Sequence, residues 1–132
     1  MNAVDTNVLV RFLVRDDLEQ HTKAAAFLNS RAPDDPAYVS LIVVVELIWV
    51  LRRLYHYSRE QIHFVLARLL ETAELAFEEE QYISMLVNKE AGVADDLADH
   101  LIVFSGAKAG CSRTVTFDKR AAKSVAGMEL LT

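Results

Sequence analysis

Residues 37–57, AYVSLIVVVELIWVLRRLYHY, decide the expected fold because they join a short strand to a long apolar segment. Residues 37–40 suit a strand, and Ser40 suits the N-cap of a helix. Six of residues 41–51 are β-branched, which favours a strand by propensity. The apolar segment nevertheless continues to Tyr57 and is long for a strand. We therefore predict a helix that is buried on most sides.

The rest of the chain repeats this alternation of strand and helix. Residues 2–10 predict a short buried strand that ends at Asp5 and turns into a helix. Further strands are predicted at 73–77, 113–117 and 128–131, and further helices at 18–30, 58–72, 78–92, 94–110 and 118–127. This order predicts an α/β fold of three layers, with a central, mostly parallel sheet of about five strands between helices. Without a linker or repeat, residues 1–132 are expected to form a single domain.

Composition narrows the classes of function. Nineteen acidic and fourteen basic residues give a net charge of −5, which does not by itself favour a nucleic-acid binder. The charge is uneven, since residues 73–99 are strongly acidic and residues 100–132 are basic. Cys111 is the only cysteine, and the start lacks the pattern of a signal peptide. We therefore expect a cytoplasmic protein without a membrane segment.

Glu46 interrupts the most apolar part of the sequence. Burying an ionised carboxylate without a partner costs several kcal/mol, so something should compensate its charge. A basic partner such as Arg53, a raised pKa, exposure on a narrow polar face, and a shared metal cation all remain open.

Several acids fall where a parallel α/β sheet places its ligands, beyond the carboxyl ends of the strands. Asp5 ends the first predicted strand and Asp118 follows the strand 113–117. Asp96 and Asp99 are three apart and share a helix face. If these acids converge with Glu46, their mutual repulsion is relieved by a hard cation with oxygen ligands, which points to Mg²⁺ or Mn²⁺. The alternatives are a turn residue for Asp5, a helix-end charge for Asp96 and a helix N-cap for Asp118.

Four blocks carry a resemblance to a known family. AVDTNVLVRFLVRDD, YVSLIVVVELIWVLRR, DLADHLIVFSGAKAGC and TVTFDKRAAK occur in this order, and together they resemble the PIN-domain ribonucleases. They are especially similar to VapC-type toxins of type II toxin–antitoxin systems. The resemblance implies a PIN-like fold and metal-dependent cleavage of RNA. Its acidic quartet falls on Asp5, Glu46, Asp99 and Asp118.

The resemblance also implies roles for these residues. Asp5 and Asp99 are expected to be the most direct ligands of Mg²⁺ or Mn²⁺, and Glu46 and Asp118 to complete the site. Asp96 matches a frequent additional acid one helical turn before Asp99. Small polar side chains that orient the carboxylates are expected at Thr6, Asn7 and Thr116.

The expected partners are RNA, a VapB-like antitoxin and a second copy of the chain. Basic residues near Asp118 are candidates for phosphate contacts, although they suit solvated helix surfaces equally well: Arg113, Lys119, Arg120 and Lys123. Apolar residues within 47–57 and 62–70 offer surface for an antitoxin, and ordinary core packing is the alternative.

Two other classes of function stay open. One is a non-catalytic binding module with the PIN fold, which the presence of all four acids disfavours. The other is a receiver or phosphatase that forms a phosphoaspartate. A phosphatase of that kind would want an aspartate two positions after Asp5, where this chain has Asn7.

Overall fold

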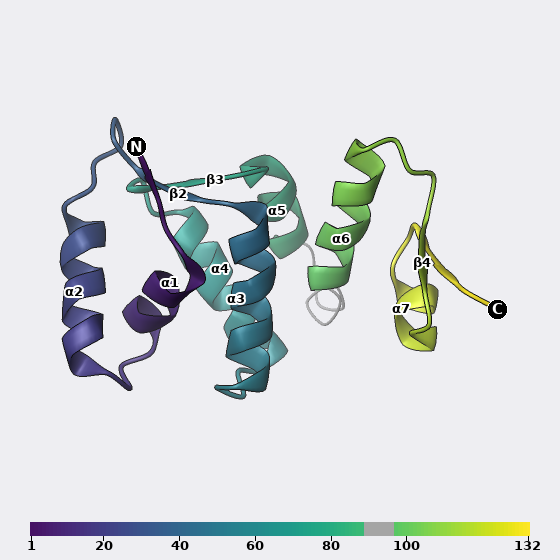
Figure 1. Ribbon diagram of the computed structural model, residues 1–132, viewed down its shortest axis with the longest axis horizontal. Helices are drawn as coiled ribbons and strands as arrows, with labels where there is room; N and C mark the ends of the chain where they lie inside the picture. Colours follow the sequence, from purple (N-terminus) through teal and green to yellow (C-terminus); the bar gives the residue numbers. More distant parts are fainter. Residues whose placement is uncertain (89–96) are drawn as a thin grey trace. The chain divides into compact units, whose positions relative to one another are not determined.

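The computed structural model describes residues 1–88 and 97–132 of the chain (Figure 1). It divides the chain into two compact units, Met1–Asn88 and Lys89–Thr132. Each unit is described by itself below. Asp95, Asp96 and the predicted helix end at Gly92 lie outside the described residues.

The first unit is built on a three-stranded parallel sheet. Its strands are β1 (Asn2–Ala3), β2 (Ala37–Val39) and β3 (Leu75–Phe77), in the order β1-β2-β3. Asn2 pairs with Ala37, and Ala37 pairs with Leu75. The helices of this unit are α1 (Thr6–Leu13), α2 (Leu18–Asn29), α3 (Leu41–Arg53), α4 (Arg59–Leu70) and α5 (Glu80–Val87).

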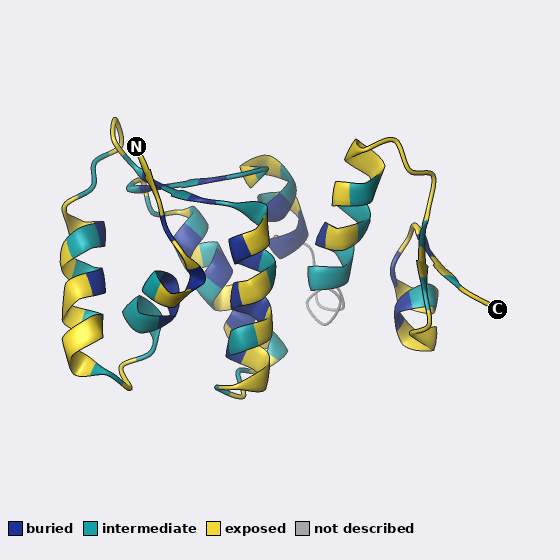
Figure 2. Cartoon of the chain, in the orientation of Figure 1, coloured by how far each residue is buried: buried dark blue, intermediate teal, exposed yellow. Residues whose placement is uncertain are grey.

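The core of the first unit lies between its sheet and helices, as the buried faces in Figure 2 show. The apolar side chains of Leu9, Leu47, Leu51, Ile62 and Leu66 are almost completely buried. Full burial of such a side chain contributes roughly 1.5–3 kcal/mol, so α1, α3 and α4 are held together mainly by these residues.

Helix α3 differs from the prediction in its length and its burial. It ends at Arg53 instead of Tyr57, because His56 takes a left-handed conformation with φ 56° and Ser58 begins the next helix with a capping box. The helix is also not buried on most sides. Ile42, Glu46 and Trp49 form an exposed stripe, because three- and four-residue steps keep them on one face.

The second unit contains a two-stranded parallel sheet. Its described elements are α6 (Leu97–Lys108), β4 (Thr114–Thr116), α7 (Lys119–Ser124) and β5 (Met128–Leu130). Thr114 pairs with Met128 and Thr116 with Leu130. Val103 packs against a small core of Ala121, Val125 and Met128.

Gly127 joins α7 to β5 at a point where a side chain would be strained. Its φ is +95°, which L-residues with a Cβ rarely adopt. A Cβ at this position would also lie 2.6 Å from Cγ1 of Val103. Both constraints explain why glycine occupies this position.

The described residues confirm an α/β fold with parallel strand pairing. The five strands lie where the sequence predicts them and form two parallel sheets, one in each unit. The first strand was predicted to be buried, and this was wrong, because both residues of β1 are exposed. None of the described helices is long and apolar enough to cross a membrane.

Candidate functional site

Three polar residues share the carboxyl edge of the first sheet. The ladder continues past the named strands, with the Val4 N–H donating to the Tyr38 carbonyl and the Glu78 N–H to the Val39 carbonyl, each at 2.9 Å. Extending the register by these steps brings Asp5, Ser40 and Glu78 level on neighbouring strands. This edge is where parallel α/β sheets bind ligands.

Asp5 is held in place by the first turn of α1. It is the N-cap of the helix, and its Oδ1 accepts the Thr6 backbone N–H at 2.9 Å. Its Oδ2 accepts the Asn7 side-chain N–H at 3.2 Å. The side chain is exposed. Asn7 therefore fixes the direction of the carboxylate and leaves its remaining lone pairs available to a ligand.

Thr6 lies beneath this turn. The residue is only 3% exposed, and its hydroxyl oxygen has no hydrogen-bond partner among the described residues. A buried hydroxyl without a partner is costly, so this position calls for a functional explanation.

Glu46 is exposed on α3 instead of buried in it. Its carboxylate has no ion-pair or hydrogen-bond partner among the described residues. The guanidinium of Arg53 lies 4.8 Å from the centroid of the Trp49 ring. The structure thus shows Glu46 exposed on a stripe between the apolar Ile42 and Trp49, and no described ion pair with Arg53 accounts for it.

Glu78 is a residue at this edge that sequence reasoning missed. Its Oε1 accepts the backbone N–H of Leu41, the first residue of α3, at 2.8 Å. Ser40 caps the same helix through the Val43 N–H at 3.3 Å. The two side chains fix the start of the helix that carries Glu46. Glu78 directly follows the predicted strand 73–77, and this position could have identified it as a residue of the sheet edge.

The second unit supplies the other two acids. Asp99 lies in the first turn of α6 and is half-buried. Asp118 is the N-cap of α7, as one of the sequence alternatives predicted: its Oδ1 accepts the Arg120 and Ala121 N–H groups at 2.9 and 3.0 Å. The Asp118 N–H donates to the Thr116 hydroxyl at 3.0 Å, which sets the turn before the helix.

A comparison with protein families decides the classification. The family model described as PIN domain matches residues 3–127. This chain belongs to the PIN-domain family. No curated protein matches it. PIN domains are in general nucleases that bind RNA and usually use divalent metal ions, so this PIN domain has a nuclease fold.

The donor set of this PIN domain fits a hard divalent cation. The four carboxylates offer oxygen ligands of the kind that Mg²⁺ and Mn²⁺ prefer. Asp5 and Glu46 belong to the first unit, and Asp99 and Asp118 to the second. In the described residues, neither unit by itself gathers three or more His, Cys, Asp or Glu side chains into a metal site.

The candidate phosphate contacts of this PIN domain are all exposed: Arg113, Lys119, Arg120 and Lys123. Arg113 pairs with Glu129 at 2.6 Å across β4 and β5, with both side chains more than half exposed. Exposed pairs of this kind contribute little to stability, so the pairing does not prevent Arg113 from contacting another anion.

Proposed function

We propose that this PIN domain is a Mg²⁺- or Mn²⁺-dependent endoribonuclease that acts as the toxin of a toxin–antitoxin pair. The main support for the proposal is the exposure and orientation of the Asp5 carboxylate. This carboxylate stands exposed at the carboxyl edge of a parallel sheet and is oriented by Thr6 and Asn7. Such preorganisation suits a ligand to a cation, and the family is one of nucleases.

The proposed cation ligands are Asp5, Glu46, Asp99 and Asp118, with Asp96 as an additional acid. The bound ion would activate a water molecule and relieve charge on the phosphate. Asn7 keeps Asp5 directed outward, and Thr116 positions the turn that presents Asp118. The proposal treats residues 1–132 as a single domain in which these acids converge.

Glu46 is the better candidate for orienting the attacking water and accepting its proton. One oxygen of Asp118 already accepts two backbone N–H groups, and these hydrogen bonds hold the carboxylate at the start of α7. Glu46 has no such hydrogen bonds among the described residues. Its longer side chain also leaves it more freedom to reach a water molecule.

We further propose a VapB-like antitoxin and a second copy of the chain as partners of this cytoplasmic protein. Leu54 and Phe64 are 70% and 65% exposed, and Trp49 is about half exposed. These residues on or next to α3 and α4 give apolar surface that a partner helix can cover.

RNA cleavage by the purified chain with Mg²⁺ tests the proposed activity. Asp5→Asn and Asp99→Asn should each lower the rate at least about a hundredfold, since each removes a charged ligand. Asp34→Asn is the matched control, because Asp34 lies exposed in the loop before β2. Full activity in both ligand variants would refute the site.

The toxin role needs a second test. Expression of the chain in a bacterium should stop growth, and expression of the Asp99→Asn variant should not. RNA cleavage without growth arrest would leave a nuclease that is not a toxin. The absence of cleavage would favour a non-catalytic binding module, and stable phosphorylation of Asp5 by a small phosphodonor would favour a receiver.

A further inference from the structure

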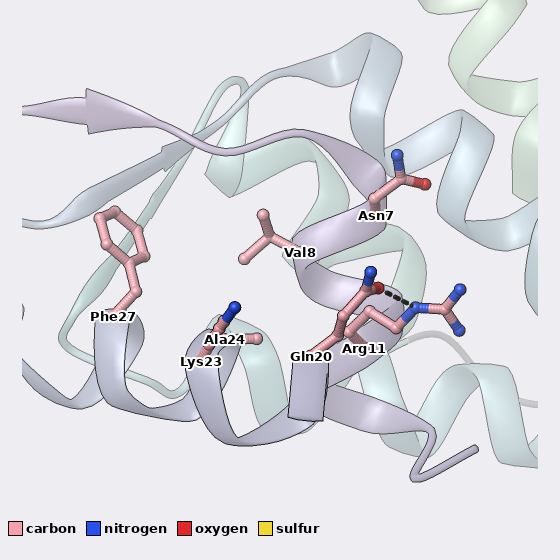
Figure 3. Close-up of a pocket in the computed structure, with 7 residues that line it drawn as sticks. All are labelled: Asn7, Val8, Arg11, Gln20, Lys23, Ala24 and Phe27. Carbon is pink, nitrogen blue, oxygen red and sulfur yellow. Dashed lines mark hydrogen bonds between the residues drawn. The ribbon is translucent and has the colours of Figure 1, made fainter. Parts of the chain in front are cut away.

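A pocket of about 250 Å³ lies between α1 and α2 in the first unit (Figure 3). Asn7, Val8 and Arg11 approach it from α1. The residues from α2 recur at steps of three and four and so share one helix face: Gln20, Lys23, Ala24 and Phe27.

The lining surface of the pocket is almost entirely apolar, and its polar side chains can act only from the rim. None of the seven lining residues is acidic, although the chain has a net charge of −5. Gln20 accepts the Arg11 Nε–H through its oxygen at 2.7 Å, which leaves its amide N–H groups to donate. Lys23 pairs only with Glu19 at 3.2 Å, and both side chains are at least three-quarters exposed. Because exposed pairs are weak, Lys23 remains able to bind an anion.

The wall of the pocket is apolar and includes an aromatic ring. Val8, Ala24 and Phe27 provide this wall. The Arg31 guanidinium lies over the Phe27 ring, 4.9 Å from the ring centroid. Aromatic rings and flat apolar walls bind the faces of unstacked nucleobases in single-stranded RNA, and the edges of those bases hold hydrogen-bond acceptors.

The pocket adjoins the proposed catalytic edge. Asn7 lines the pocket and donates to Oδ2 of Asp5. Asn7 therefore links the pocket to the carboxylate that is proposed to act at the reacting phosphodiester. We propose that the pocket binds one nucleobase of single-stranded RNA, stacked at Phe27, while Lys23 contacts a neighbouring phosphate. This inference rests on the proposed nuclease function and adds a substrate subsite to it.

Fluorescence anisotropy with a labelled oligouridylate tests the subsite in the presence of EDTA, where binding is read without metal-dependent cleavage. Phe27→Leu should weaken binding about fivefold to a hundredfold, the range expected for loss of one stacked base. It should leave binding of an abasic ribose-phosphate oligomer of equal length unchanged. Phe27→Tyr keeps a ring and should bind the oligouridylate nearly as well as the unaltered chain.

Lys23→Ala should weaken binding of both oligomers. It should also reduce the slope of log Kd against log salt concentration by about 0.7, the value for one phosphate contact on a single strand. The matched controls are Phe12→Leu, whose ring stacks on His21 and does not line the pocket, and Lys108→Ala. Both controls should bind as the unaltered chain does.

The subsite would be overturned by equal effects of Phe27→Leu on both oligomers or by no effect on either. Failure of the chain to bind oligouridylate would overturn it as well. The outcome is distinguishable from failure of the proposed function. If the chain binds RNA through Phe27 but does not cleave it, the subsite stands and the proposed nuclease activity is wrong. If the chain cleaves RNA and Phe27→Leu does not change binding, the nuclease activity stands and the subsite is wrong.

Discussion

Glu78 offers the sharpest test of how the sheet edge positions α3. Glu78→Ala removes the carboxylate that accepts the Leu41 N–H at 2.8 Å. Loss of a hydrogen bond to a charged group costs about 1.5–3 kcal/mol, and loss of a negative charge at a helix N-terminus adds about 0.3–1 kcal/mol. Ser40 keeps its own bond to the helix, so the cost should stay near ~2–3 kcal/mol. Glu78→Gln retains an acceptor and should cost about 1 kcal/mol.

Urea unfolding measures this cost as a lower midpoint at an unchanged slope. Glu71→Ala is the control, because this exposed residue at the end of α4 should shift stability by less than about 0.5 kcal/mol. Mg²⁺ uptake by the folded Glu78→Ala variant should also weaken, since the first turn of α3 precedes Glu46. If Glu78→Ala unfolds like its control, the cap does not fix this helix and the reasoning is wrong.

Three further predictions concern other parts of the chain. Burial lowers the pKa of His63, and its Nε2 has no hydrogen-bond partner among the described residues. The unfolded chain therefore binds more protons, and stability should fall as pH drops below about 6.5; His63→Leu should flatten this fall in urea titrations, and an unchanged slope would contradict the assignment. The hydrogen bond from the Tyr55 hydroxyl, at 2.8 Å, is the main reason that the pKa of Asp16 lies below its ordinary value. Tyr55→Phe should raise that pKa in a carboxyl NMR titration, and a pKa that does not move would show that another group sets it. Gly127→Ala should cost about 1–3 kcal/mol in thermal unfolding from its positive φ, and Val103→Ala should restore only the part due to the clash; full rescue would mean that φ imposes no strain.

Local patterns in the sequence were sufficient to predict most elements. Ser40 was predicted as a helix N-cap, and an N-cap was the alternative given for Asp118; each accepts a backbone N–H group at the start of its helix. These signals depend on residues within a few positions of one another. Such N-cap signals can therefore be recognised without knowing the tertiary contacts of the helix.

Features that depend on distant contacts were not predicted. Glu78 caps α3 from 37 residues away, and no local pattern gives that distance. Exposure was one of four open explanations of Glu46, whereas the burial expected on most sides of its helix was wrong, because the three- and four-residue steps through Ile42 and Trp49 place Glu46 on an exposed stripe. The early end of α3 follows from the left-handed His56, which its residue type does not indicate.

The sequence proposes a set of candidate site residues, and the structure describes the local geometry of two of them. The sequence singled out Asp5 and Asp118 because each follows a strand, and the structure adds the groups that orient them. Asn7 donates to Asp5, and the Asp118 N–H donates to Thr116. Side-chain orientation depends on the turn conformation after each strand, which the strand pattern alone does not specify.

Titration calorimetry of Mn²⁺ uptake tests the central claim most directly, using the unaltered chain, Asp5→Asn, Asp99→Asn and the double variant. If one ion is shared by carboxylates from both units, either single substitution abolishes or severely weakens uptake, and the double variant adds little further loss. If both single variants take up Mn²⁺ as the unaltered chain does, these acids do not share an ion and the proposed nuclease site is wrong.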